Sequence, residues 1–373
     1  MVRSSDSTSG NQSLSDSLRT TVDAALPFNR TQNMSWTPTT EDRARFTLQD
    51  LISSKIGFEQ LAIARYEEIC DRISDFVDSH YDTGWKRNIK QSLDSFILRG
   101  CKPISRRWKS VDPAAFGILM YHRCTPPVEC ETEPTWNVTP DQLENQLRGL
   151  LDLGFTPIPL STAVKHHQLG MELPPNAFVV TFDDGYANNY THALPVLEKL
   201  GVPATIFLAT AYIDEFVPFP SDDWSCSGKA DPISWRPLTL EEAHKLNKSE
   251  LIELGTHTHT HDDFRNRPRD FERDLEISLE FIKREFDIVH PTFAFPFGVR
   301  RFGFSSDELI RAARKTQVRC SLSTEGQLAH LRQSPYYWGR FTAHQTDDAH
   351  LLAVKLSGWY SRIKQGMRKL AGR

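Results

Sequence analysis

The sequence lacks long apolar runs. None of its segments approaches the roughly 18 uninterrupted apolar residues that a membrane-spanning helix needs. Residues 1–18 are polar and rich in serine, and they contain no apolar core of the kind found in secretory signals. Taken as it stands, the sequence predicts a chain that stays in the cytoplasm.

Paired cysteines are also missing. The 6 cysteines lie at positions 70, 101, 124, 130, 226 and 320, and no two of them are spaced as CxxC. These spacings argue against a zinc site built from cysteines. We expect free thiols, while a disulfide between Cys124 and Cys130 stays open as an alternative.

An excess of positive charge is absent as well. The 373 residues include 44 Lys and Arg against 48 Asp and Glu, a formal net charge of -4. Nucleic-acid binding needs a basic field that neutralises phosphates, so no nucleic-acid partner is expected. The hydrophobic share of 39% and the charged share of 25% are ordinary for a globular chain with a core.

Composition divides the chain into four parts. Residues 1–40 are rich in Ser, Thr, Asn and Pro and predict a disordered tail. Residues 41–110 show apolar positions at helical spacing, with no proline before Pro103, and predict a helical extension. Residues 111–345 predict the main domain, and residues 346–373 a C-terminal helix.

The main domain alternates short apolar runs with helical patterns. The expected strands are Phe116–Tyr121, Ala177–Phe182, Ala204–Leu208, Leu251–Leu254, Thr292–Phe295 and Gln317–Leu322. The expected helices include Ala193–Leu200, Leu240–Leu246, Asp270–Phe286, Ser306–Lys315 and one that begins after Thr139 with Pro140 in its first turn. Strands alternating with helices indicate an α/β fold with a parallel sheet. The spacing suits a distorted (β/α) barrel of about seven strands, with chemistry at the C-terminal strand ends.

The expected C-terminal helix is amphipathic and becomes basic toward its end. Trp359 and Tyr360 lie among Lys and Arg in this segment. One interpretation is a helix packed on the main domain with a solvated basic end. The other is peripheral contact with an anionic membrane surface.

Two adjacent carboxylates carry the strongest chemical signal. Asp183, Asp184 and Gly185 directly follow the apolar run that ends at Phe182. Because adjacent residues at a strand end point in different directions, one carboxylate can bind a metal while the other faces the substrate. Gly185 lets the chain turn sharply and keeps the site open.

Three histidines in five residues form the second signal, in a chain with 13 histidines altogether. Neutral imidazole is a common metal ligand. His257 and His259 would share a face if the strand continued, whereas His257 and His261 would do so if the chain turned helically. The segment is not the HExxH pattern, because Thr258 takes the place of the glutamate.

Together these motifs resemble the polysaccharide deacetylase family with the NodB-homology domain, also called carbohydrate esterase family 4. The Pro-aromatic segment from Phe293 to Gly298 fits the same family. Met120-Tyr121-His122 and Asn137-Val138-Thr139-Pro140 are similar to the branch that contains poly-N-acetylglucosamine deacetylases. The resemblance covers roughly residues 113–345.

The resemblance implies a role for each motif residue. Asp184, His257 and His261 would bind a divalent metal, with Zn2+ as the default and Co2+, Ni2+ or Fe2+ as alternatives. His259 falls at a variable position and is not expected to be a ligand. Asp183 would be the general base, and His122 the general acid. The peptide N–H of Phe297 would stabilise the oxyanion.

The sequence departs from the family pattern in two places. Many relatives have an arginine that orients the base where this chain has Phe293, so Arg123 or Arg340 is expected to pair with Asp183 instead. The late Leu-x-His motif is not evident, and His330, His344 and His350 are expected to be surface residues. Trp224 and Trp235, in a proline-rich loop, either stack on sugar rings or anchor the loop.

The function that the sequence predicts is hydrolysis of the N-acetyl amide of N-acetylated sugars in a polysaccharide or glycoconjugate, which would be its partner. A second hypothesis is a hydrolase of another small or cyclic amide. A third, from a different class, is a metal-holding glycan-binding protein with little turnover. The presence of both Asp183 and Asp184 argues against the third, since a binding protein needs no base.

Overall fold

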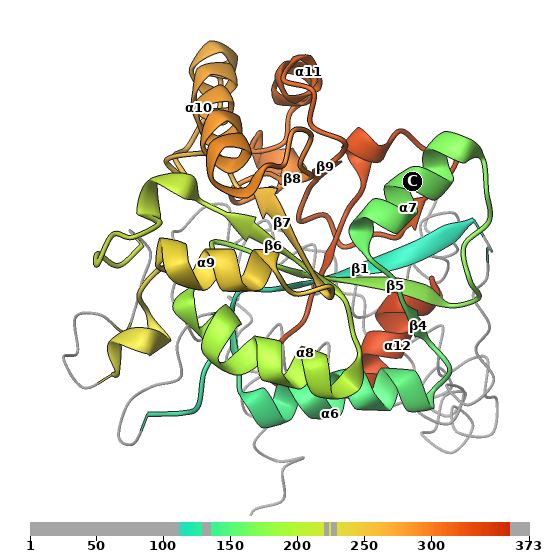
Figure 1. Ribbon diagram of the computed structural model, residues 1–373. Coiled ribbons are helices and arrows are strands. Elements are labelled where there is room, and N and C mark those ends of the chain that lie inside the picture. Colours follow the sequence, from blue (N-terminus) through green and yellow to red (C-terminus); the bar gives the residue numbers. More distant parts are fainter. Residues whose placement is uncertain (1–111, 113, 129–135, 220–223, 225–229, 359–373) are drawn as a thin grey trace, which may run out of the picture. The chain divides into compact units, whose positions relative to one another are not determined.

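The computed structural model describes residues 112, 114–128, 136–219, 224 and 230–358 (Figure 1). The predicted tail and the predicted helical extension lie outside these residues. So do four of the six cysteines, including Cys130. The two described cysteines, Cys124 and Cys320, are buried free thiols.

The main domain is built around one large sheet. Its strands are β1 (Ala115–Tyr121), β4 (Thr156–Pro157), β5 (Ala177–Phe182), β6 (Ala204–Leu208), β7 (Ile252–Thr256), β8 (Phe293–Ala294), β9 (Ser321–Leu322), β10 (Ala329–His330) and β11 (Phe341–Thr342). The order is β10-β1-β5-β6-β7-β8-β9, with β11 also pairing β1 and β4 also pairing β5. All pairs are parallel except β1 with β10. A separate small sheet pairs β2 (Arg123–Cys124) with β3 (Asn137–Val138).

Helices connect the parallel strands. The α-helices are α6 (Pro140–Asp152), α7 (Leu160–Leu169), α8 (Leu194–Leu200), α9 (Leu240–Asn247), α10 (Pro268–Phe286), α11 (Asp307–Lys315) and α12 (Ala349–Ser357). Shorter turns are the π-helix η2 (Asn189–Ala193) and the 3-10 helices η3 (Thr210–Tyr212), η5 (Pro232–Ser234), η6 (Arg300–Phe302) and η7 (Pro335–Tyr337). α6 begins as predicted: Thr139 caps it, Gln142 completes a capping box, and Pro140 occupies the first turn.

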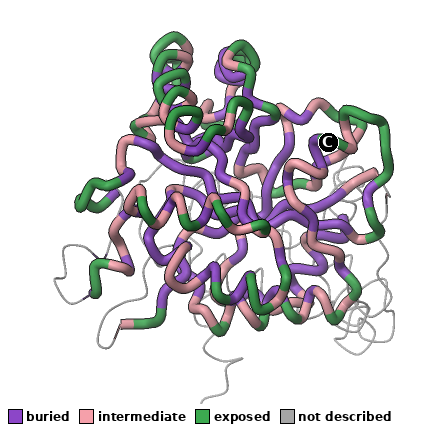
Figure 2. Tube along the Cα trace, in the orientation of Figure 1, coloured by how far each residue is buried: buried purple, intermediate pink, exposed green. Residues whose placement is uncertain are grey.

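The central strands are buried on both faces (Figure 2). Phe178, Val180 and Phe182 of β5 pack with side chains of α6 and α8, whereas Val179 belongs to a second cluster with Phe116. This alternation follows the two-residue period of a strand. In Figure 1, α6 and α8 lie below β1 and β5, and α10 and α11 lie above them. A continuous apolar run is what a strand covered on both faces requires.

The α/β class and the parallel sheet are therefore as predicted. The ladders run from β10 at one edge to β9 at the other, and beyond β9 the structure has a single parallel bridge between Leu322 and Trp338. These ladders do not establish a closed barrel, which stays a prediction.

Within the predicted C-terminal segment, the structure describes the short helix α12. This helix packs against the core of the main domain. Leu352, Ala353 and Leu356 belong to the core, and a side chain at Gly117 of β1 would overlap Leu356. The helix ends at Gly358, whose φ is 79°. The basic residues 359–373 lie outside the described part, so the membrane contact stays a prediction.

No helix among the described residues is long and apolar enough to cross a membrane. The cytoplasmic location stays a prediction.

Candidate metal centre and catalytic site

Asp183 and Asp184 follow β5 and point in different directions. Asp183 is buried against Arg340, and Asp184 faces two histidines. The backbone turns the two side chains in different directions, since Asp184 and Gly185 both have a positive φ, 72° and 83°. A Cβ at Gly185 would lie 2.9 Å from Leu208, so both conformation and space favour glycine there.

His257 and His261 approach the same oxygen of Asp184. The Nε2 atom of His257 lies 3.5 Å from Asp184 Oδ1, and that of His261 lies 3.4 Å from it. The chain turns after His257, because Thr258 and His261 both have positive φ. Of the two arrangements that the sequence left open, the structure has the turned one.

His259 points elsewhere. Its Nδ1 atom lies 3.0 Å from the hydroxyl of Thr210. It is not part of the group of Asp184, His257 and His261, whose ligand atoms lie within 4.8 Å of one another. This placement agrees with the expectation that His259 is not a ligand.

The three grouped residues fit a divalent metal. Asp184 Oδ1 is buried and accepts no hydrogen bond among the described residues. Two ligands about 2.1 Å from a tetrahedral zinc lie about 3.4 Å apart, close to the separations between Asp184 and the two rings. The Nδ1 atom of His257 lies 2.8 Å from the carbonyl of Ala294, which directs the Nε2 lone pair of His257 toward Asp184.

The charges of the group also suit a cation. Burial lowers the pKa of His257 to about 4, so its ring is neutral at pH 7. Burial raises the pKa of Asp184, but the facing His261 ring outweighs it and holds this pKa below its ordinary value. Asp184 in turn raises the pKa of His261 against the effect of burial. A metal would replace the proton of His261 and be released in acid.

Arg340 holds Asp183 with two hydrogen bonds. Its Nη1 atom donates to Oδ1 over 2.5 Å and its Nη2 atom to Oδ2 over 2.7 Å. Both side chains are almost fully buried. Burial raises the pKa of Asp183, but the Arg340 charge outweighs it and keeps this pKa below its usual value.

Arg123, the other candidate for this pairing, lies over the ring of Tyr186 and donates to its hydroxyl over 3.2 Å. The alternative that named Arg340 is therefore the one that the structure supports.

His122 follows β1 and lies close to Asp183. Its Nε2 atom lies 4.0 Å from Asp183 Oδ2. Burial lowers the pKa of His122 despite the two nearby carboxylates. The ring stacks on Trp136, with ring centres 5.4 Å apart, and Trp136 also stacks on His344 at 6.0 Å.

Trp136, which is 46% exposed beside the site, was not among the predicted site residues. The sequence feature that could have pointed to Trp136 is its position just before the Asn137-Val138-Thr139-Pro140 motif. His344, expected at the surface, is half-buried and belongs to this stack.

Phe297 borders the group of Asp184, His257 and His261. Its ring centre lies 5.1 Å from that of His261, and its side chain is 44% exposed. The residue has a φ of 60°, and its N–H makes no hydrogen bond within the described residues. This N–H is therefore available to a ligand.

The other candidates lie apart from this group. Trp224 is buried, and Trp235 packs against Phe216 with ring centres 5.5 Å apart, which favours loop anchoring. His330 pairs with Asp112 over 2.8 Å, and His350 is half-buried in α12.

Comparison with known proteins shows a similarity to one family over part of the chain. Residues 170–321 match the family model described as polysaccharide deacetylase. Over these residues the chain is similar to the polysaccharide deacetylase family. The match contains Asp183, Asp184, His257 and His261. His122 and Arg340 lie outside it, so their place in the site comes from the structure.

The proteins that are similar to this chain include two named enzymes. It is 31% identical over 124 residues, 33% of its length, to the poly-beta-1,6-N-acetyl-D-glucosamine N-deacetylase of Escherichia coli K12. It is 23% identical over 229 residues, 58% of its length, to the enzyme of the same name from Staphylococcus aureus MSSA476. These matches span 18% of the first enzyme's length and 71% of the second's.

Solved deacetylases share the fold. The Streptococcus pyogenes deacetylase PplD matches with a TM-score of 0.54 and 18% identity, over 66% of this chain and 99% of that one. A de-N-acetylase from Aggregatibacter actinomycetemcomitans matches with a TM-score of 0.53 and 18% identity, over 64% and 99%. At this identity the likeness concerns the fold alone.

Proposed function

We propose that this chain is a metal-dependent hydrolase that removes acetyl groups from N-acetylated sugars in a polysaccharide or glycoconjugate. The observation that carries the proposal is that the two adjacent carboxylates have different neighbours. Asp184 faces two histidines, and Asp183 is held by Arg340 and faces His122. A metal-holding binding protein has no need for the second carboxylate.

Asp184, His257 and His261 would hold the metal, with zinc as the default for two imidazoles and one carboxylate. When bound, a divalent metal polarises the amide carbonyl and lowers the pKa of water from about 16 toward 7. Cobalt, nickel or iron would suit the same ligands.

The other residues perform the proton transfers. Asp183 would take the proton of the attacking water, and Arg340 keeps Asp183 anionic for this task. The water oxygen bonds to the amide carbon, and the N–H of Phe297 would donate to the resulting oxyanion. His122 would then protonate the departing nitrogen, so that the C–N bond breaks and acetate and an amine leave. Because burial lowers the pKa of His122, a smaller fraction of the rings carries the proton at neutral pH, but that proton is transferred more readily.

The substrate class rests on the relatives and on the exposed rings. The relatives from E. coli and S. aureus are named for poly-β-1,6-N-acetyl-D-glucosamine. Trp136 and Phe297 are exposed beside His122 and His261, where they can stack on sugar rings. A poly-N-acetylglucosamine-like glycan is therefore the substrate to try first.

Acetate release tests the proposal. Purified protein loaded with zinc should release acetate from N-acetylglucosamine oligomers and not from a panel of small linear and cyclic amides, and Asp183→Asn should abolish release. Faster turnover of a small amide would favour the second hypothesis. Glycan binding without acetate release, unchanged in Asp183→Asn, would overturn the enzyme in favour of a binding protein.

A further inference from the structure

Two adjacent asparagines, Asn188 and Asn189, contact the backbone that carries His122. Both side chains are fully buried. They lie at the start of the π-helix η2, where the N–H of Leu194 donates to the carbonyl of Asn189, five residues earlier in the chain. Such widened turns are rare and often occur at functional sites.

The chain after β1 needs hydrogen-bond partners on two sides. On one side, Arg123 and Thr125 each donate their N–H over 3.2 Å to carbonyls at or next to β3. Because successive residues of an extended chain turn their backbone groups to opposite sides, the carbonyl of His122 and the N–H of Cys124 face away from β3. These two groups need other partners.

The two asparagines supply these partners. The Nδ2 atom of Asn189 donates to the carbonyl of His122 over 2.8 Å, and the N–H of Cys124 donates to Oδ1 of Asn188 over 2.8 Å. The Nδ2 atom of Asn188 also donates to two carbonyls of η5, over 3.2 Å each. The carboxamides therefore take the place of a neighbouring strand and hold the backbone of His122.

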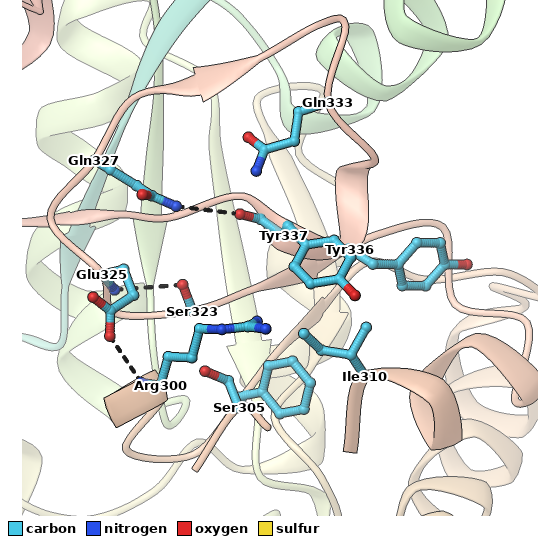
Figure 3. A pocket seen from close by; sticks show the side chains of 10 residues that line it. Arg300, Ser305, Ile310, Ser323, Glu325, Gln327, Gln333, Tyr336 and Tyr337 are labelled. Atoms are coloured by element: carbon cyan, nitrogen blue, oxygen red, sulfur yellow. Dashed lines mark hydrogen bonds between the residues drawn. The ribbon is translucent and has the colours of Figure 1, made fainter. Parts of the chain in front are cut away.

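Packing alone does not explain a carboxamide at position 189. The Oδ1 atom of Asn189 is buried and accepts no hydrogen bond among the described residues, which costs stability. Gln327, which lines the pocket in Figure 3, also donates to a backbone carbonyl, that of Tyr337, but its side chain is exposed. The benefit of the buried carboxamide of Asn189 therefore lies in its one hydrogen bond, to His122.

The segment that ends with Asn189 also carries the proposed base. Asp183 lies six residues earlier, and its N–H donates to the carbonyl of Tyr121 over 2.9 Å. The consecutive carbonyls of Tyr121 and His122 are thus both held by residues 183–189. This arrangement fixes the relative position of the two side chains, with His122 Nε2 at 4.0 Å from Asp183 Oδ2.

We propose that Asn189, supported by Asn188, is a positioning residue that holds His122 where it can pass a proton to the departing nitrogen. The inference rests on the proposed function, which makes His122 the general acid. Asn189 acts through the backbone of His122 and needs no contact with the substrate. A displacement of about 1 Å in such a group can lower the rate about 100-fold.

Substrates with different leaving groups test the inference. In Asn189→Leu, which keeps the size of the side chain, the ratio of kcat for an N-acetylated sugar to kcat for an aryl acetate should fall about 10- to 100-fold. The ratio does not depend on how much of the variant is folded or loaded with metal. Asn247→Leu is the matched control, because Asn247 of α9 also donates to a backbone carbonyl, that of Phe286 over 3.4 Å. Its ratio should equal that of the wild type.

A second comparison shows whether Asn189 acts through His122. Once the ring is removed in His122→Ala, nothing is left to position, so adding Asn189→Leu should not lower the ratio further. An unchanged ratio in Asn189→Leu alone, or a further fall of the same size in the double variant, would overturn the inference.

NMR of the His122 ring separates this inference from the proposed function. The ring signals, assigned by their absence from His122→Ala, should shift in Asn189→Leu and stay in place in Asn247→Leu. A wild type that releases no acetate from N-acetylated sugars overturns the proposed function. Ring signals that do not shift in Asn189→Leu overturn the positioning role, whatever the activity.

Discussion

Arg340 and Asp183 form a buried pair with two hydrogen bonds, although 157 residues separate them in the sequence. The pair joins the end of β5 to the segment just before β11. Its planar geometry fixes the orientation of Asp183, and its charge sets the protonation of the carboxylate. Removing either partner leaves a buried charge without compensation.

Replacing Arg340 tests whether Asp183 acts as a base. A base must be deprotonated, and without the guanidinium the burial of Asp183 raises its pKa. In Arg340→Met the acid limb of kcat/KM should therefore move to higher pH, and activity at neutral pH should fall about 10- to 100-fold. Arg340→Lys, which keeps a charge, should show a smaller displacement. An unmoved acid limb in Arg340→Met would contradict the assignment.

Metal removal tests the group of Asp184, His257 and His261. A metal that binds only the folded state at 100 times its Kd stabilises it by about 2.7 kcal/mol. We expect a chelator to abolish acetate release and lower the melting temperature, and added zinc to restore both. Asp184→Ala should be inactive and its melting temperature insensitive to zinc. A zinc response that persists in Asp184→Ala would place the metal elsewhere.

Substrates with different leaving groups test whether His122 acts as the general acid. An amine needs a proton to depart, so His122→Ala should lower kcat for N-acetylated sugars by about 10²–10⁴-fold. Because the acid must be protonated, the alkaline limb of the wild-type profile should flatten in this variant. An aryl acetate has a leaving group that needs little protonation, so its hydrolysis should fall much less. Equal losses for both substrates would assign His122 a structural role.

Much of the fold could be predicted because the central strands are buried on both faces. The bounds of β5 and β6 follow directly from their apolar runs. The expected strand over Gln317–Leu322 is shorter in the structure, Ser321–Leu322, because Gln317 has a φ of 67° that a strand does not tolerate. The helix α7 was not predicted, since its N-terminus lacks a side-chain cap and only Gly170 marks its end.

The site was predictable where its residues follow one another along the chain. Adjacent aspartates and three close histidines need only the local backbone to come together. Arg340 and Trp136 reach the site from distant segments, and the sequence offered two arginines without deciding between them. The choice depends on the pairing of β11 with β1, which brings Arg340 to the end of β5.

Asp274 of α10 accounts for the shape of the histidine loop. Its carboxylate accepts hydrogen bonds from the N–H of His259 over 2.7 Å and from the hydroxyl of Thr260 over 2.6 Å. These contacts fix the turn that brings His261, with its φ of 55°, back to Asp184. We therefore expect Asp274 to act as a positioning residue for the candidate metal site.

The variant Asp274→Asn should weaken zinc binding about 10- to 100-fold, the usual cost of losing a group that orients a ligand. The amide of Asn accepts on one side only, so the Thr260 hydroxyl must reverse from donor to acceptor, and the 3.3 Å contact of the Thr260 N–H with the second carboxylate oxygen is lost. Asp270→Asn on the same helix is the control, because Asp270 is exposed and, among the described residues, pairs only with exposed Arg267 over 3.1 Å. Zinc affinity measured by calorimetry should fall in Asp274→Asn alone. Equal affinities in the two variants would show that the loop holds its shape without Asp274.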